Sequence, residues 1–346
     1  MRRCIACSGF LSLLMALCAL ASPIAAKAAG NLVMYCGVQE EWCRAVSAAF
    51  ERETGISVAM TRKSAGEVYA QVKAEAANPR GDIWWGGTGD PHQQAANEGL
   101  TVEYKPANFD ELYDWAQLQW QETKGRTVGI YSGALGFGYN EKLLKSKGLP
   151  EPKCWADLTN PAYKDEIQVA DPNSSGTAYN LLATIVQIMG EEKGFAYLKA
   201  LHKNVNQYTK AGAAPAQAVN LGETTIGITF MHDMIAAAQD NPDIKTVAPC
   251  EGTGYEIGSM SLIKGAHNLD NAKKFYDWAL TPAAQVLAAQ NKSYQTPSNK
   301  KTPLPKLGVD LSKTKLIQYD FARYGSSEVR NALLKRWTDE VKNQPR

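Results

Sequence analysis

Residues 127–140, "TVGIYSGALGFGYN", form an unusually long run with β-strand character. The run contains four glycines between Gly129 and Gly138 and no residue pattern that would begin a helix. We interpret it as an extended segment that crosses from one lobe of the protein into another. A second extended run, "IKTVAPCEGTGYEIGSMSLIKG" at 244–265, is expected to cross back. Two crossing segments predict a hinged protein whose two lobes enclose a central cleft.

Upstream of residue 127, short apolar runs alternate with amphipathic stretches. "NLVMYCG", "ISVAMTR" and "DIWWGG" have the composition of strands, and a stretch with helical spacing follows each of them. Repeated strand–helix units of this length predict an α/β fold with a parallel sheet covered by helices. In such sheets, ligands bind beyond the carboxyl ends of the strands. The division we expect is a first lobe of 29–130 plus about 258–346, a second lobe of 131–257, and hinge crossovers near 128–138 and 247–262.

The N-terminus has the composition of a secretory signal peptide. A basic start, "MRR", precedes the apolar stretch "FLSLLMALCALA" and the small residues of "AAKAAG". The apolar stretch is too short to span a bilayer, so residues 1–28 are expected to be cleaved near Ala28 during export. Removal of Arg2, Arg3 and Lys27 leaves 37 − 3 = 34 basic residues against 35 acidic ones. A near-neutral chain argues against a nucleic-acid surface or a polybasic membrane anchor.

Cleavage would also leave an even number of cysteines: Cys36, Cys43, Cys154 and Cys250. An even count in an exported protein favours disulfides, and four cysteines allow three connectivities. Pairing of Cys36 with Cys43 in a local loop, and of Cys154 with Cys250, is favoured by spacing. A zinc site is the alternative, although this spacing without neighbouring histidine pairs is poor for zinc.

Three expected helix starts combine small residues with free backbone N–H groups. They are Ser64-Ala65-Gly66, Ser174 to Thr177, and Gly212 to Ala214 before Pro215. The positive end of a helix dipole and its unpaired N–H groups attract anions, and a phosphate accepts more hydrogen bonds than a carboxylate. Ordinary helix capping by Ser and Thr is the alternative interpretation. Thr88, in the glycine-rich "GGTGD" after a strand, is a further donor that could reach a ligand.

A polar pair, His232 and Asp233, follows the apolar run "TTIGITF". Such a pair could cap a turn, bind a metal, act in catalysis or accept hydrogen bonds from ligand hydroxyls. The sequence contains no H-E-x-x-H or G-x-S-x-G motif that would accompany a metalloprotease or an α/β-hydrolase. Glu256, in the second crossover, is expected to face the same cleft. Carboxylates and an imidazole gathered in this way are suited to gripping hydroxyl groups.

The chain resembles the periplasmic substrate-binding proteins of ABC importers, in the group related to ferric-ion binders. The resemblance covers essentially the whole chain after the signal peptide. It depends on "LVMYCG", "GDIWWGGTGDP", "GFGYNEKLL", "PNSSGTAYN" and "TPAAQ". It implies a monomeric two-lobe protein without cofactor or enzymatic activity, which delivers a small solute to a membrane permease.

Ferric-ion binders carry adjacent tyrosines where this chain has "MHD", and no Tyr-Tyr pair occurs in the sequence. The chain looks most like the subgroup that binds hexose phosphates, by its cysteine pair after the first strand, "GGTGDP", and His-Asp where iron binders have tyrosines. This likeness implies that sugar hydroxyls contact His232, Asp233 and Glu256, with Glu251 as the substitute for Glu256. It assigns the phosphate to Ser64, Ala65, Gly66, Thr88, Ser175, Gly176, Thr177 and Ala214. The alternatives are an aminoalkyl phosphonate, ferric iron and, more remotely, an exported hydrolase.

Overall fold

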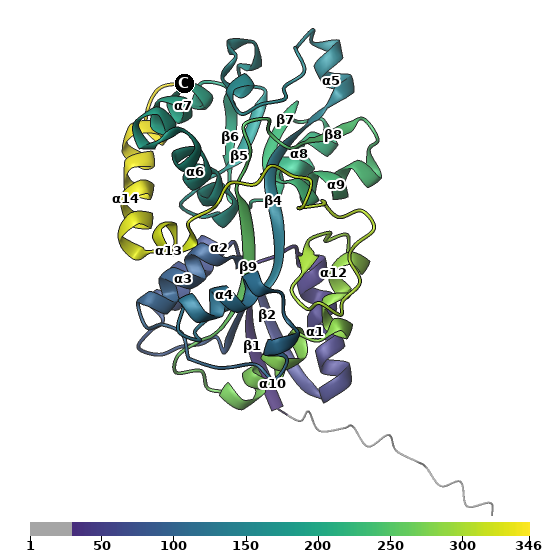
Figure 1. Cartoon of the computed structure of the whole chain (residues 1–346), viewed down its shortest axis with the longest axis vertical. Coiled ribbons are helices and arrows are strands. Elements are labelled where there is room, and N and C mark those ends of the chain that lie inside the picture. The colour runs from purple at the N-terminus through teal and green to yellow at the C-terminus, as the bar shows by residue number, and fades with distance from the viewer. Residues whose placement is uncertain (1–29) are drawn as a thin grey trace, which may run out of the picture.

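The computed structural model describes residues 30–346, so the expected signal peptide at 1–28 lies outside the described residues (Figure 1). Its strands join in the order β2-β1-β3-β9-β4-β7-β5-β6, with β8 and β10 pairing with β4. Their bounds are β1 Gly30–Cys36, β2 Ile56–Arg62, β3 Ile83–Thr88, β4 Val128–Asn140, β5 Ile167–Ala170, β6 Val205–Thr209, β7 Ile226–Phe230, β8 Ile244–Val247, β9 Tyr255–Leu262 and β10 Thr296–Pro297.

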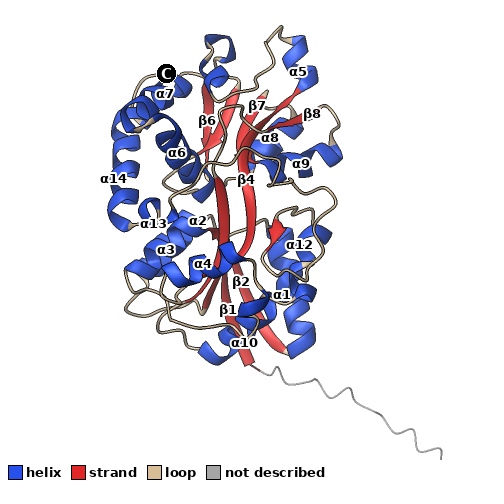
Figure 2. Cartoon of the chain, viewed as in Figure 1, coloured by secondary structure: helices blue, strands red, loops and turns tan. Residues whose placement is uncertain are grey.

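Helices surround the sheet on both sides (Figure 2). They are α1 Glu40–Thr54, α2 Ala65–Ala74, α3 Gly89–Asn97, α4 Asp114–Glu122, α5 Glu141–Ser146, α6 Gly176–Met189, α7 Glu191–His202, α8 Ala214–Leu221, α9 Met231–Asp240, α10 Leu269–Ala279, α11 Pro282–Gln285, α12 Leu287–Gln290, α13 Phe321–Tyr324 and α14 Ser327–Trp337. None of the helices in residues 30–346 has both the length and the apolar character required to cross a bilayer.

The long strand β4 connects the two halves of the molecule, as its sequence predicted. Its first part pairs antiparallel with β9, from Val128 opposite Met260 to Ala134 opposite Tyr255. Its second part pairs with β7, beginning with Leu135 opposite Phe230. β9 and β7 lie on opposite sides of β4, so the pairing passes from one side of β4 to the other between consecutive residues. Together with β9, β4 runs through the middle of the molecule (Figure 2). This arrangement confirms the two-lobe α/β fold with crossing strands.

Each half of the molecule has its own hydrophobic core. One cluster contains Leu32, Phe50 and Phe275, and the other contains Phe137, Trp155 and Phe195. The C-terminal residues Tyr319, Tyr324, Leu333, Trp337 and Val341 belong to the second cluster. The sequence predicts that the whole of about 258–346 belongs to the first lobe. We now propose that the segment from about 317 onward belongs to the second lobe, because its apolar side chains pack there.

Both expected disulfides are present. Cys36 is bonded to Cys43, and Cys154 is bonded to Cys250. The first disulfide closes the loop between β1 and α1, and the second ties the loop before β9 to the segment that follows α5. The loop closed by the first disulfide contains Gly37, Val38 and Gln39.

A buried polar cluster joins the two lobes behind the hinge. Asp90, in the first turn of α3, accepts a hydrogen bond from Tyr319 Oη at 3.2 Å. Arg330 of α14 lies over the ring of Tyr179, 4.5 Å from its centroid. Burial raises the pKa of Asp90 to about 6, although the nearby Arg330 guanidinium acts in the opposite direction. Burial also lowers the pKa of Arg330. The native fold therefore favours a protonated Asp90 below about pH 6.

This cluster gives a prediction for the pH dependence of stability. Because the pKa of Asp90 is higher in the folded protein, its contribution is full below about pH 4 and is lost as the pH rises through about 6. The Asp90→Asn variant cannot titrate at this position, so it does not lose this contribution as the pH rises. Its free energy of unfolding, relative to that of the wild type, should therefore increase by roughly 1–2 kcal/mol between pH 5 and pH 7.5. Chemical denaturation of both proteins at each pH measures this difference in the free energy of unfolding. An identical difference at the two pH values would contradict the prediction.

Candidate functional site

Six helices begin at one cavity between the lobes. Among the described residues, the N-cap residues of α1, α2, α3, α6, α8 and α9 all line it: Gln39, Ser64, Thr88, Ser175, Ala213 and Phe230. Each helix start supplies unpaired N–H groups and the positive end of its dipole. Convergence of this kind creates a strong preference for a negatively charged ligand.

Hydroxyl groups gather at the start of α6. A Cβ added to Gly212 would lie 2.1 Å from Thr177 Oγ1 and 3.0 Å from Ser175 Oγ, so both hydroxyls face the Gly212 backbone. From the opposite lobe, Thr88 Oγ1 lies against Gly176, where an added Cβ would be only 1.8 Å away. Thr88 Oγ1 is buried and has no hydrogen-bond partner among the described residues. This end of the cavity is therefore rich in hydrogen-bond donors.

His232 and Asp233 form part of the first turn of α9, directly after β7. Asp233 accepts hydrogen bonds from Gln39 Nε2 at 2.6 Å and from Thr229 Oγ1 at 2.8 Å. The His232 ring stacks on Phe230, and its Nε2 lies 3.1 Å from Gln295 Nε2. Gln39 and Gln295 both come from the other lobe, so these contacts hold the lobes together in a closed arrangement.

Glu256 lies beside His232. A Cβ on Gly133 would be 2.7 Å from His232 Nδ1 and 3.6 Å from Glu256 Oε1, so both groups approach the same point of β4. Burial, aided by the charges of Asp233 and Asp90, raises the pKa of Glu256 well above its usual value. Burial lowers the pKa of His232, against the opposing effect of Asp233. A neutral imidazole and a neutral carboxyl group next to Asp233 can both donate and accept hydrogen bonds.

The cavity includes most of the residues that the sequence indicated. Nine line it: Ser64, Ala65, Thr88, Ser175, Gly176, Thr177, His232, Asp233 and Glu256. Gly66 does not, because its N–H donates to Ser174 O at 3.1 Å across the lobes. Ala214 is also outside the lining, where the preceding Gly212 and Ala213 take its place.

Several lining residues were not identified from the sequence. Gly37, Val38 and Gln39 lie in the loop closed by the first disulfide, and Arg62 ends β2. Tyr131 accepts a hydrogen bond from the Gly87 N–H at 3.0 Å, and burial raises the pKa of its phenol well above the usual value. The position of Gln39 directly before a helix start was the one usable signal. Gln295 reaches the cavity from a distant segment that has no recognisable motif.

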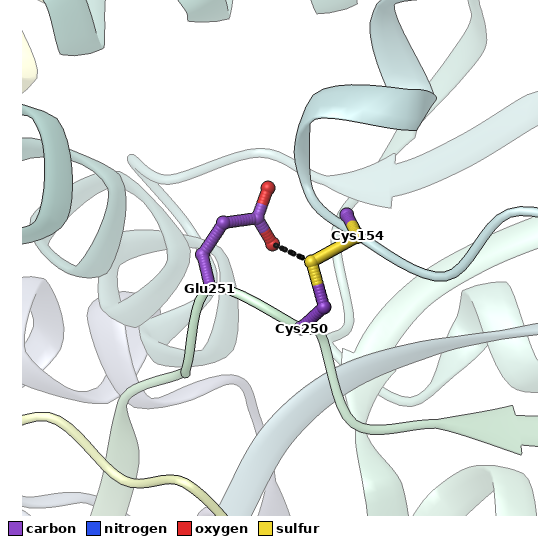
Figure 3. Close-up of side chains that lie close together, drawn as sticks. All are labelled: Cys154, Cys250 and Glu251. Carbon is purple, nitrogen blue, oxygen red and sulfur yellow. Dashed lines mark hydrogen bonds between the residues drawn. A yellow bond between two sulfur atoms is a disulfide. The ribbon is translucent and has the colours of Figure 1, made fainter.

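Glu251, the substitute for Glu256, lies elsewhere (Figure 3). Its carboxylate accepts hydrogen bonds from the backbone N–H groups of Trp155 and Ala156, at 2.8 and 2.9 Å. Among residues 30–346, Glu251 with Cys154 and Cys250 forms a group at metal-ligand spacing. The two sulfurs are bonded to each other, so neither is a thiolate that could bind zinc. Glu251 caps the start of a short helical turn and does not face the cavity.

Two lobes joined by crossing strands, closed over a polar cavity at the starts of six helices, define the class of solute-binding proteins. Comparison with known proteins agrees with this. Residues 86–323 match the model of the family described as bacterial extracellular solute-binding protein. The chain belongs to this family and, as the resemblance implied, is the solute-binding component of an ABC importer.

Three similar proteins illustrate the relationship. The periplasmic binding protein AfuA of Actinobacillus pleuropneumoniae, solved with exogenous fructose-6-phosphate bound, is 42% identical with a TM-score of 0.88, covering 91% of this chain and 100% of that one. An uncharacterized protein of Haemophilus influenzae is 45% identical over 92% of both chains. A candidate 2-aminoethylphosphonate-binding periplasmic protein of Salmonella typhimurium is 28% identical over 72% of both chains.

Two of the four glycines of β4 give a prediction about the cavity. Gly133→Ala would place a methyl group against His232 and should lower the affinity for the solute that the cavity binds at least about tenfold, or 1.4 kcal/mol. Isothermal titration calorimetry measures the affinity. Gly129→Ala is the matched control, because its methyl group would instead press on Ile257 and Ala116. It should lower the melting temperature without changing the affinity of the folded protein. Equal affinities of Gly133→Ala and wild type would refute this role of Gly133.

Proposed function

We propose that the protein captures a hexose phosphate and delivers it to its permease. The observation that carries the proposal is the division of the cavity into two chemically different ends. Helix starts, hydroxyls and the backbone of Gly176 and Gly212 supply donors at one end. His232, Asp233 and Glu256 supply acceptors and exchangeable protons at the other. A phosphate fits the first end, and sugar hydroxyls fit the second.

The fructose-6-phosphate found in AfuA supports this choice of ligand, since AfuA is 42% identical over nearly its whole length. The raised pKa of Glu256 supports it as well. A neutral carboxyl group satisfies a hydroxyl by donating one hydrogen bond and accepting another. It offers an ammonium group no countercharge.

An aminoalkyl phosphonate is the second candidate. The Asp233 carboxyl group could pair with an ammonium group, and the Salmonella relative is described as binding an aminoalkyl phosphonate. A phosphonate would occupy the same donor-rich end of the cavity. The two candidate ligands therefore differ in the group that contacts His232, Asp233 and Glu256, which is a set of hydroxyls in one case and an ammonium group in the other.

A thermal-shift panel separates the candidates. Glucose 6-phosphate and fructose 6-phosphate should raise the melting temperature, because a ligand at 100 times its Kd stabilises the folded state by about 2.7 kcal/mol. Free glucose and free fructose at the same concentration should not, since they lack the phosphate. A shift with 2-aminoethylphosphonate and none with either hexose phosphate would replace the sugar assignment with the phosphonate one.

The polar end of the cavity can be tested by substitution. Asp233→Asn should weaken hexose phosphate binding roughly 10- to 100-fold, because a hydrogen bond to a charged group contributes about 1.5–3 kcal/mol. Asp270→Asn is the matched control, since Asp270 also lies in the first turn of a helix but outside the cavity. Calorimetry should give the control the wild-type Kd. Unchanged binding by Asp233→Asn would remove Asp233 from the site.

We further propose that the chain is exported to the periplasm with cleavage near Ala28, and that it acts there as a monomer without enzymatic activity. The family assignment supports a role in solute binding. The N-terminal sequence pattern supports export. The mass of the secreted protein would locate the cleavage site.

A further inference from the structure

Arg62 has a position in the cavity that neither the helix starts nor the polar end explains. It is the last residue of β2, opposite Cys36 in the parallel pairing with β1. Its Nε donates a hydrogen bond to Val38 O at 3.0 Å. Val38 belongs to the loop that the Cys36–Cys43 disulfide closes. The guanidinium is thus anchored through one nitrogen to a covalently constrained loop.

The terminal nitrogens of Arg62 are not engaged by an acidic group. Within residues 30–346, no carboxylate oxygen lies within 4.0 Å of the Arg62 guanidinium, whereas Arg44 and Arg336 both form ion pairs. Arg62 is half-buried, and it is the one lysine or arginine among the described residues that line the cavity. A guanidinium held in a cavity without a countercharge is ready to receive an anion.

The location of Arg62 indicates which end of the ligand it meets. Ser64, two residues further along, caps α2, and Ser64 and Ala65 line the same cavity. Asp233 comes from the start of α9 and Glu256 from β9, so neither belongs to the β2–α2 segment that carries Arg62. The positive side chain therefore lies with the α2 start, the part of the site that we assign to the phosphate.

We propose that Arg62 binds the phosphate of the ligand directly and selects for its doubly charged form. This inference rests on the proposed function and deepens it. Helix starts and hydroxyls offer partial charges, which a singly charged ester can satisfy. A guanidinium adds a full charge and a planar pair of donors matched to two phosphate oxygens. The second ionisation of a phosphate monoester has a pKa of about 6, so the doubly charged form predominates at pH 7.5.

The test compares Arg62→Gln and Arg62→Lys with the wild type by calorimetry with glucose 6-phosphate and fructose 6-phosphate. Arg62→Gln should raise the Kd at least tenfold at pH 7.5. Arg62→Lys, which keeps the charge but loses the planar pair of donors, should give an intermediate Kd. Arg52→Gln is the matched control, because it removes the same charge from an exposed position in the last turn of α1. It should bind as the wild type does.

The pH profile distinguishes direct phosphate binding from a structural role. Wild-type affinity should fall about tenfold from pH 7.5 to pH 5, as the ligand loses its second charge. The Arg62→Gln profile should be flatter. The other titratable groups of the cavity, His232, Asp233, Glu256 and Tyr131, are the same in both proteins and cancel in the comparison. Parallel pH profiles would overturn the proposal even if the affinity of the variant is reduced.

The outcomes also separate this inference from the proposed function. If the wild type binds a hexose phosphate and Arg62→Gln binds it equally well, Arg62 is not a phosphate ligand and the proposed function stands. If the wild type binds 2-aminoethylphosphonate instead, the same variants are titrated with that compound, and a tenfold loss in Arg62→Gln supports the role of Arg62. If the wild type binds neither phosphorylated compound, the inference fails together with the proposed function. Circular dichroism and the melting temperature verify that each variant is folded.

Discussion

The site depends on one geometric constraint, which is that the helices following the parallel strands all begin at the same place. In each lobe, parallel strands end facing the cleft, and every helix that follows directs unpaired N–H groups toward it. These partial positive charges favour an anionic ligand and also reduce the cost of burying Asp233 in the first turn of α9. A preference for an anionic ligand is in this sense a property of the fold, and the side chains refine it.

The exchange of partners along β4 explains how such a site can open. Ala134 belongs to the pairing with β9 and Leu135 to the pairing with β7, so a small backbone rotation between them would move the lobes apart. In the closed arrangement, Gln39 contacts Asp233, and the N–H of Gly66 contacts Ser174 O. Gln295 also contacts His232, and Ser64 Oγ donates to Lys210 O. A ligand that bridges both lobes would add to these polar contacts.

Local patterns sufficed to predict much of this from the sequence. Helix starts at Ser64 and Ser175, the crossing strand and the Cys36–Cys43 disulfide could be inferred because each depends on neighbouring residues. The Cys154–Cys250 disulfide, with a sequence separation of 96, followed only as the remaining pair. The expected start of α8 is confirmed at Ala214, but Gly212 and Ala213, which precede the helix, line the cavity in place of Ala214. Gln295 and the packing of the C-terminal helices depend on contacts between distant segments. The helical periodicity of the C-terminal segment predicts that one face of each helix is buried, but it does not show which of the two cores that face contacts.

The path of the C-terminal segment has a practical consequence. The described part of the chain starts with β1, at the far end of the first lobe, and Arg346 lies beside α7 of the second (Figure 1). The two ends therefore belong to bodies that move relative to each other when the cleft closes. Fluorescent proteins fused before residue 30 and after Arg346 would change their separation on closure. Energy transfer between them would then report solute capture in real time, without modification of the cavity.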